Sequence, residues 1–298
     1  MEDDPAGSIG DGRQVLAVDV GGTKIEAAVV DRDGVVVARH REPTPVGTDA
    51  DEVFDAVRAC IDAVAAGRAL EACGIGCGGP MDIASGRVSP LNIPAWRGYP
   101  LRDQVAAHTG LPVFVDNDAK ALARGEGWIG AGAGREDFLA MVVSTGIGAG
   151  IVLDGRLLGG RLGNAGHLGH VVVEPAGRPC ACGGRGCLEA EASGTAIAQM
   201  TGTSPAAAPE HLRRRVGMLV GRAVADAANL LDLDLAVVAG SVALGFGMSF
   251  LTAAREEVHR RSRLDFSRST RITFAPSGTD APLLGAAALA WGAGPEAA

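Results

Sequence analysis

One histidine and three cysteines lie close together in the second half of the sequence. Their spacing is H-x9-C-x-C-x4-C, formed by His170, Cys180, Cys182 and Cys187. Three thiolates and one imidazole are ligands that suit tetrahedral zinc, and three cysteines in so short a glycine-rich stretch are hard to explain as packing. Because four protein ligands leave no open position on the metal, the sequence predicts a structural Zn²⁺ that fixes this loop.

A second group of chemically capable side chains follows an apolar run that begins at Val113. It consists of Asp116, Asn117 and Asp118, placed where a strand is expected to give way to a helix. A carboxylate beside a hydroxyl can accept its proton as the oxygen attacks a phosphorus atom. Asp and Asn at such a position are also favoured helix N-caps. The residues alone leave both interpretations open.

Two glycine-rich turns, at 21–24 and 146–150, are each expected to join two apolar strands. Such turns leave backbone N–H groups unobstructed, and these can hold phosphate oxygens. The P-loop pattern is missing, and a strand rather than a helix follows each turn. Asp19 can orient hydrated Mg²⁺, while Thr23 and Thr145 add hydroxyl donors. Either turn alone is equally an ordinary hairpin, but the pair favours phosphate binding.

These residues must be positioned by an alternating α/β chain. The stretch VLAVDVGGTKIEAAVVDRDG is echoed by LAMVVSTGIGAGIVLDGRL, which predicts two lobes that each open with a hairpin. The apolar runs predict strands over 15–20, 25–30, 35–39, 73–77, 112–115, 139–145, 151–153, 235–239 and 271–275. Helical patterns cover 49–67, 101–110, 119–128, 211–231, 247–261 and 281–291, and residues 160–190 are predicted to be loop-like.

Several of these motifs together resemble a known superfamily. DVGGTK at 19–24, STGIGAG at 144–150, VAGS at 238–241 and the closing PLLGAAALA resemble the phosphate and adenosine loops of the sugar kinase/hexokinase/actin superfamily. GNAGHLGH at 163–170 and CACGGRGCLE at 180–189 resemble the ROK family of bacterial sugar kinases and repressors. The resemblance runs from about residue 15 to 292, nearly the whole chain.

The resemblance implies an α/β, two-lobed actin-like ATPase fold of the ribonuclease H-like type. Each lobe would be a mixed sheet flanked by helices, with a zinc-bound loop. We expect a sugar and phosphate lobe over 14–119, completed by a C-terminal helix at 281–292. The second lobe would span 120–280 and carry the nucleotide site and the zinc loop.

The resemblance also assigns residues to roles in an ATP- and Mg²⁺-dependent sugar kinase. Asp118 becomes the general base that assists attack by the C6 hydroxyl of a hexose. The expected nucleotide-site residues are Asp19, Gly21, Gly22, Thr23, Lys24, Thr145, Gly146, Gly148, Gly240 and Ser241. The expected sugar-site residues are Gly79, Asn92, Asn117, Asp118, His167, His170 and Glu189. The loops that carry Gly79 and Asn92 can equally be ordinary turns.

One position departs from the family's glucokinases. Most of them carry Glu in the phrase GExGH, whereas this chain has His167. A neutral histidine offers one donor and one acceptor, unlike a carboxylate. The family's N-acetylmannosamine kinases also carry His there. Glucose, an amino or N-acetyl hexose and a cyclitol are therefore all candidate acceptors, unless His167 simply replaces Glu as a hydroxyl partner.

Composition excludes several other classes of function. The 298 residues carry 27 basic and 35 acidic side chains, a net charge of −8, which argues against general nucleic-acid binding. No apolar run approaches the roughly 18 residues of a membrane span. The acidic start, residues 1–5, has no export signal, so we expect a cytoplasmic protein without disulfides. The three remaining cysteines are predicted to be buried thiols: Cys60, Cys73 and Cys77.

Two other functions within the family stay as alternatives. A repressor would need a DNA-binding head before the first phosphate motif, and only about 14 residues precede Val15. A non-catalytic sugar sensor would not need Asn117 and Asp118 together with two glycine turns. The resemblance further implies a homodimer or homotetramer, with no nucleic-acid or membrane partner.

Overall fold

The computed structural model describes residues 12–47 and 49–296. The acidic start of the chain therefore lies outside the described residues. The strands are β1 Gln14–Val20, β2 Lys24–Asp31, β3 Val36–Pro43, β4 Cys73–Cys77, β5 Met81–Asp82, β6 Arg87–Val88, β7 Val113–Asn117, β8 Phe138–Val143, β9 Ile147–Leu153, β10 Arg156–Leu157, β11 Leu235–Ala239 and β12 Arg271–Phe274. The helices are α1 Ala50–Ala65, α2 Leu101–Thr109, α3 Asp118–Ile129, α4 Leu188–Ala192, α5 Gly194–Thr201, α6 Glu210–Leu231, α7 Ser241–Arg261 and α8 Ala281–Trp291, with 3₁₀ turns at Leu168–His170, Pro205–Ala207 and Gly278–Asp280.

Two five-stranded sheets repeat one topology. The first has the order β3-β2-β1-β4-β7, and the second has the order β10-β9-β8-β11-β12. In each, three consecutive strands form an antiparallel meander, and two later strands add in parallel beside the first. The internal repeat predicted from the sequence is therefore confirmed. A short β5–β6 hairpin stands apart from both sheets.

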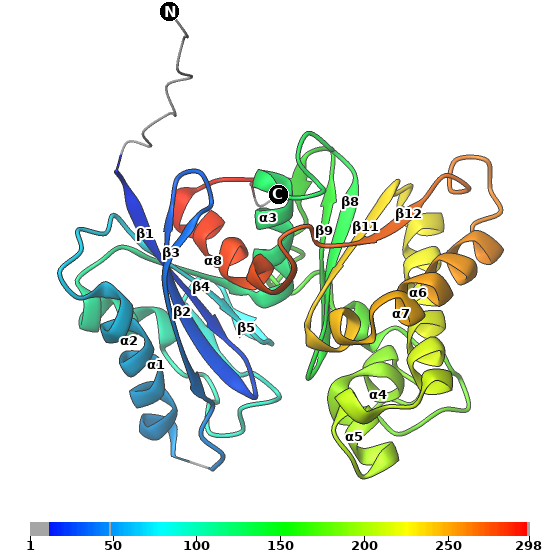
Figure 1. Ribbon diagram of the computed structural model, residues 1–298, viewed down its shortest axis with the longest axis horizontal. Helices are drawn as coiled ribbons and strands as arrows, with labels where there is room; N and C mark the ends of the chain where they lie inside the picture. Colours follow the sequence, from blue (N-terminus) through cyan, green and yellow to red (C-terminus); the bar gives the residue numbers. More distant parts are fainter. Residues whose placement is uncertain (1–11, 48, 297–298) are drawn as a thin grey trace, which may run out of the picture.

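Helices cover both faces of each sheet, as Figure 1 shows. Helices α1 and α2 lie on the outer side of the first sheet, and α6 and α7 lie on the outer side of the second. Between the sheets run α3 and α8, where α8 packs on β1 and β4 and α3 packs on β8 and β9. The chain thus returns at its end to the sheet where it began. Two mixed sheets flanked by helices confirm the predicted fold class.

The two central helices touch backbone to backbone. A Cβ on Gly125 of α3 would lie 2.8 Å from the Gly285 nitrogen, and one on Gly285 would lie 2.6 Å from the Ala121 carbonyl carbon. Any side chain at either position would force the helices apart. Helix α3 contacts β4 of the first sheet as well as β8 and β9 of the second, so it belongs to both halves. The lobe boundary between residues 119 and 120 stays a proposal.

The structure corrects two predicted element boundaries and adds a helix that the sequence did not predict. Strand β9 begins at Ile147, so Gly148 and Gly150 lie inside a strand and not in the turn. A Cβ on Gly150 would lie 2.6 Å from the Ala123 Cβ, so this glycine allows α3 to pack closely on β9. Helix α7 begins at Ser241, six residues before the predicted start, and is broken at Gly247. Helix α5 was not predicted at all.

Among the residues that the structure describes, no helix combines the length and the apolar character needed to cross a membrane.

Candidate active site

The carboxyl ends of three parallel strands bring acidic residues together. In the ladders of β1, β4 and β7, Asp19 lies opposite Gly76, and Gly76 lies opposite Asp116. A Cβ on Gly76 would sit 3.5 Å from the Asp118 Cα and 3.9 Å from the Asp19 Oδ1. Because Gly76 has no side chain, the Asp19 and Asp118 carboxylates converge across it. Ligands of open α/β sheets bind at such carboxyl edges.

Both converging carboxyls hold their protons more tightly than usual. Burial raises the pKa of Asp19 to about 7, and the negative charge of Asp118 adds to the shift. Burial also raises the pKa of Asp118, to which Glu189 contributes while a hydrogen bond from the Ala119 N–H opposes it. A carboxylate with a raised pKa is a stronger base at neutral pH.

The structure shows that Asn117, and not Asp118, is the N-cap residue of α3. Asn117 is the N-cap of α3, and its Oδ1 accepts from the Ala119 N–H at 3.1 Å. Asp118 is the first helical residue, and only its Oδ1 accepts from that same N–H, at 2.8 Å. Asp116 instead forms a buried ion pair with Lys120, at 3.3 Å. The helix therefore uses only the Oδ1 of Asp118, and the other carboxylate oxygen accepts no hydrogen bond from the start of α3.

The two glycine turns meet between the sheets. The Thr23 and Thr145 hydroxyls, one from each turn, lie 2.9 Å apart in a hydrogen bond. Asn92 lies against both turns, because a Cβ on Gly22 would be 2.5 Å from its Cβ and one on Gly146 would be 3.1 Å from its Nδ2. Glycine at position 22 is therefore required for Asn92 to reach this point, and a Cβ at position 146 would crowd both Asn92 and the Glu189 carboxylate.

Glu189 lies in the first turn of α4, and His167 lies in the loop that precedes that helix. Glu189 Oε2 accepts from the Ile147 N–H at 2.8 Å, which fixes the start of α4 to the start of β9. A Cβ on Gly79 would lie 3.2 Å from the Asn117 Nδ2 and 3.4 Å from the His167 Cε1. Gly79, Asn117 and His167 are therefore neighbours. Burial, with help from the charge of His170, lowers the pKa of His167 and favours the neutral ring.

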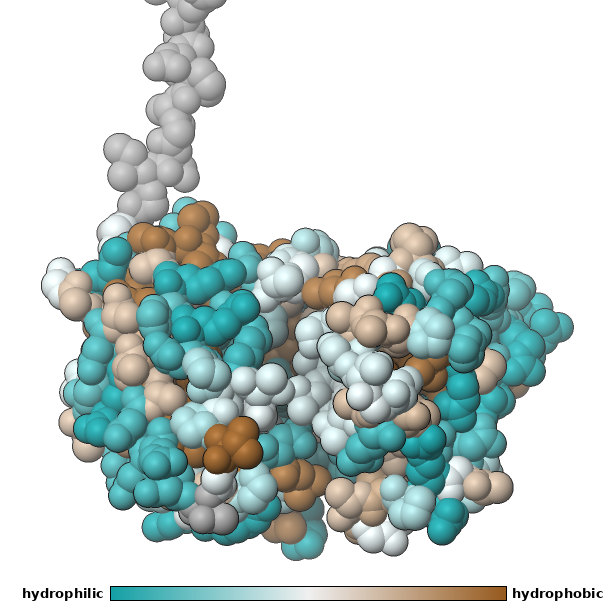
Figure 2. Space-filling view, turned by 60° about the horizontal axis from the view of Figure 1, so that its bottom comes forward, coloured by the Kyte–Doolittle hydropathy of each residue, from teal (hydrophilic) through white to brown (hydrophobic). Residues whose placement is uncertain are grey.

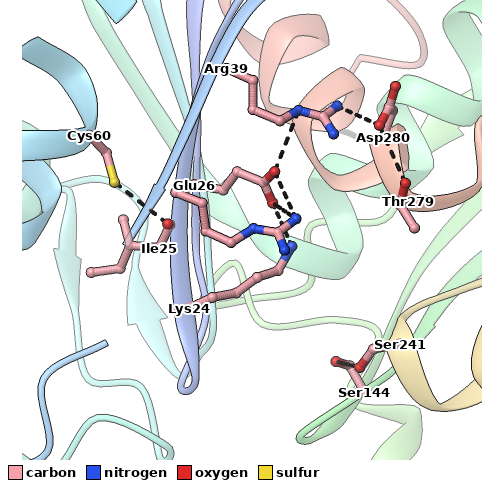
Figure 3. Close-up of polar contacts among 10 residues, drawn as sticks. Lys24, Ile25, Glu26, Arg39, Cys60, Ser144, Ser241, Thr279 and Asp280 are labelled. Atoms are coloured by element: carbon pink, nitrogen blue, oxygen red, sulfur yellow. Dashed lines mark hydrogen bonds and ion pairs between the residues drawn. The ribbon is translucent and has the colours of Figure 1, made fainter. Parts of the chain in front are cut away.

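Gly240 and Ser241 extend the second turn. Gly240 has φ 102°, and a Cβ there would lie 2.4 Å from the Val143 carbonyl oxygen. The Ser241 and Ser144 hydroxyls are 2.9 Å apart, as Figure 3 shows. Gly21 completes the first turn, with its N–H donating to the Lys24 carbonyl at 2.9 Å. Gly148 lies inside β9 and so outside the turn that was predicted to contain it.

A charged cluster on β2 and β3 faces the second turn across the space between the sheets (Figure 3). Its centre is Glu26, which is only 1% exposed. Glu26 pairs with Lys24, with Arg41 at 3.0 Å and with Arg39 at 3.5 Å. Although burial opposes it, hydrogen bonds from Lys24 and Arg41 lower the pKa of Glu26. Arg39 also pairs with Asp280, which leaves three cations against two carboxylates.

The predicted metal ligands form a compact cage. One ligand atom from each of the four residues lies within 4.8 Å of all the others. The Cys182 and Cys187 sulfurs are 3.8 Å apart, and the Cys180 sulfur is 3.6 Å from the His170 Nδ1. Tetrahedral zinc with Zn–S bonds of about 2.3 Å would space two sulfurs by about 3.8 Å. The donor set and its spacing therefore fit Zn²⁺.

The cage is close to the predicted sugar residues. The rings of His170 and His167 have centroids 5.9 Å apart, and Glu189 lies two residues after Cys187.

The other three cysteines are buried and free, as predicted. Figure 2 shows the surface hollowed between the two halves of the molecule.

Sequence reasoning missed several residues that hold this site in place. Thr44 donates to the Gly21 carbonyl at 2.7 Å, and Asn164 exchanges hydrogen bonds with the backbone of Met81. Thr195 donates to the Thr145 carbonyl at 2.9 Å. Thr44 and Thr195 stand in no recognisable motif, whereas Asn164 belongs to the GNAGHLGH motif, which gave no sign of its contact with Met81.

Comparisons with known proteins agree with this architecture. The ROK family matches residues 15–293. A glucokinase of Thermotoga maritima is 34% identical over 308 residues, covering 93% of this chain and 96% of the relative. An N-acetylmannosamine kinase of Citrobacter koseri is 36% identical over 295 residues, covering 93% and 98%.

Solved structures show the same likeness. The crystal structure of a ROK family glucokinase from Streptomyces griseus, in complex with glucose and AMPPNP, is 33% identical with a TM-score of 0.84. The alignment covers 94% of this chain and 99% of that one. Matched over nearly its whole length, the chain belongs to the ROK family, within the actin-like hexokinase superfamily.

Proposed function

We propose that the chain is an ATP-dependent sugar kinase that phosphorylates the C6 hydroxyl of a hexose. The observation that carries this proposal is the meeting of the Asp118 carboxylate with two glycine turns at one edge of the first sheet. Relatives named glucokinase and N-acetylmannosamine kinase support the reaction class.

Asp118 would act as the general base. The C6 oxygen attacks the γ-phosphorus, a new P–O bond forms, and the bond to the β–γ bridging oxygen breaks to release ADP. The hydroxyl proton passes to Asp118, whose raised pKa suits it to accept a proton near neutrality. General-base assistance of this kind typically contributes about 10²–10⁴-fold in rate.

The nucleotide phosphates would lie between the glycine turns. Backbone N–H groups of both turns and the Thr23 and Thr145 hydroxyls supply donors, while Lys24 and Arg41 supply positive charge. Asp19 would hold hydrated Mg²⁺, which neutralises phosphate charge when bound. Its buried carboxyl and those cations form a site that suits a charged triphosphate–metal complex.

The sugar would be held by side chains from both halves of the molecule. Asn117, Glu189 and Asn92 offer acceptors and donors for hydroxyl groups around Asp118. His167 favours a second candidate, a kinase for N-acetylmannosamine or another amino hexose or cyclitol. A neutral His167 beside Gly79 presents one donor and one acceptor where a glutamate would present only acceptors.

A coupled ADP-release assay over a panel of acceptors tests the proposal. The panel contains glucose, mannose, glucosamine, N-acetylglucosamine, N-acetylmannosamine and cyclitols. We expect one acceptor to be phosphorylated well above the ATPase rate in water, and Asp118→Asn to lower kcat by about 10²–10⁴-fold. The matched control is Asp265→Asn, an exposed carboxylate far from the turns.

Two outcomes would overturn the proposal. One is that no acceptor raises ADP release above the rate in water, and the other is that Asp118→Asn keeps full turnover. Calorimetric binding of a sugar without any ADP release would point to the sensor alternative. N-acetylmannosamine as the preferred acceptor would select the second candidate.

A further inference from the structure

A second concave site lies at the edge of the second sheet opposite the glycine turns. It has a volume of about 470 Å³ and is lined by residues at the amino ends of β11 and β12 and the C-terminal half of α7. Leu235 and Arg271, the first residues of these two strands, both line it. The second glycine turn follows the carboxyl ends of β8 and β11, so the two sites are separated by the length of the sheet.

Five basic side chains line this hollow, and no acidic one does. They are Arg135, Arg255, His259, Arg268 and Arg271, which we call the arginine hollow. Clustering of this kind is unexpected in a chain whose net charge is −8. It concentrates positive potential in one concavity, which attracts anions.

The charges in the arginine hollow are only partly compensated. Arg135 pairs with Asp234, and Arg268 pairs with Asp265 at 3.2 Å. The Arg255 Nε donates to the Ile272 carbonyl at 3.1 Å, which leaves its terminal nitrogens available. Arg271 has no carboxylate within ion-pair distance among the described residues. Four guanidiniums against two carboxylates leave a net positive site.

The rest of the lining determines what kind of anion fits. Leu235, Val258 and Ile272 supply apolar surface, and Thr270 and Thr273 supply hydroxyl groups. Guanidinium groups bind phosphate through paired N–H donors, and an apolar floor suits an organic group attached to it. A volume of a few hundred Å³ is typical of sites for small molecules.

We propose that the arginine hollow binds a small organic phosphate, at a place separate from the phosphoryl-transfer site. The inference rests on the residues of the hollow alone and does not depend on the proposed kinase activity. Arg271 is the main determinant, because it is exposed and lacks a carboxylate partner.

Calorimetry with phenyl phosphate and with inorganic phosphate on the full chain tests this. We expect phenyl phosphate to bind more tightly than inorganic phosphate, and Arg271→Glu to weaken its binding at least tenfold. The matched control, Arg214→Glu on α6, reverses an exposed arginine outside the hollow and should leave the affinity unchanged. Circular dichroism and the Tm of each variant verify that it is folded.

The competing outcomes are distinguishable. Equal loss in both variants would mean a general charge effect and would overturn the site, as would unchanged binding in Arg271→Glu. Equal affinity for phenyl phosphate and inorganic phosphate would mean that the hollow binds anions without recognising an organic group, and it would overturn the proposal of an organic phosphate site. Persistence of binding in the presence of saturating ATP analogue supports a separate site, and complete competition places the probe at the phosphoryl-transfer site instead.

Discussion

At the scale of the residue, the buried carboxyl of Asp19 lowers the stability of the folded protein when it is ionised. Its carboxyl is 9% exposed, and it faces Asp118 across the side-chain-free Gly76. Burial raises its pKa to about 7, so the folded protein must either protonate this group or tolerate a buried charge. If Asp19 holds hydrated Mg²⁺ as proposed, its carboxylate would cost stability whenever the metal is absent.

The pH dependence of unfolding should reveal this cost. An acid whose pKa is higher in the folded state binds its proton more tightly there, so the free energy of unfolding falls as pH rises from about 4 to 7. In metal-free buffer, the free energy of unfolding of wild type should therefore fall by about 2–3 kcal/mol more than that of Asp19→Asn when the pH is raised from 5 to 8. Urea unfolding at both pH values measures it, with Asp33→Asn as an exposed control. A difference that stays constant with pH would contradict the assignment.

Glu189 should tune the proposed base through its charge. It raises the pKa of Asp118, so Glu189→Gln should lower that pKa and shift the acid limb of the kcat profile to lower pH. Initial rates at saturating substrates between pH 4.5 and 8 measure the limb. Glu256→Gln, exposed on α7, should leave it in place. A limb that moves upward would remove the electrostatic link between Glu189 and Asp118.

At the scale of the element, the proposed zinc would stabilise the segment 160–187, which precedes α4 and contains no α-helix or strand. The segment contains one 3₁₀ turn and two isolated β-bridges, and it carries His167 and leads into Glu189 of α4. Its backbone hydrogen bonds are those of turns and isolated bridges, so a metal held by the four-ligand cage would add to its order. Zinc at that point would order sugar-binding groups without contacting the reaction.

Removal of one ligand tests this. Cys182→Ser should abolish stoichiometric zinc by elemental analysis, lower the Tm, and raise the sugar KM more than the ATP KM. Cys60→Ala, a buried thiol outside the cage, should keep its zinc. A Cys182→Ser protein with full zinc content, or one whose ATP KM alone changes, would refute a role of the cage in shaping the sugar site.

The sequence predicted elements best where local chemistry dominates. Strand β4 and helix α8 were predicted with their observed ends, and Gly110 closes α2 at φ 69° as expected. The prediction that Gly148 lies in a turn was wrong. Alternating glycines are typical of turns, but in β9 they let α3 pack closely on the strand. The Thr23–Thr145 bond joins residues 122 positions apart, and no local pattern contains such a contact.

At the scale of the whole molecule, the halves are joined where α3 crosses α8. Gly125 and Gly285 meet there with no side chain between them. Gly285→Ala should therefore destabilise the protein by about 1–3 kcal/mol and lower kcat even where the variant is fully folded. Thermal unfolding and initial rates measure the two effects. Gly245→Ala in α7, with open space around its Cβ, is the matched control and should lower neither stability nor kcat.

If Gly285→Ala lost stability but kept its full kcat, the crossing would matter only for packing. The glycine contact would then have no part in placing the two halves for reaction.

That crossing also makes α3 a short lever. Asp118 begins the helix and Gly125 lies seven residues further on, about 10 Å along the axis. A tilt of about 5° at the crossing would displace the carboxylate by about 1 Å, and a misplacement of that size can cost about 10²-fold in rate. The precision of the proposed base is therefore set two helical turns away, by two residues that have no side chains.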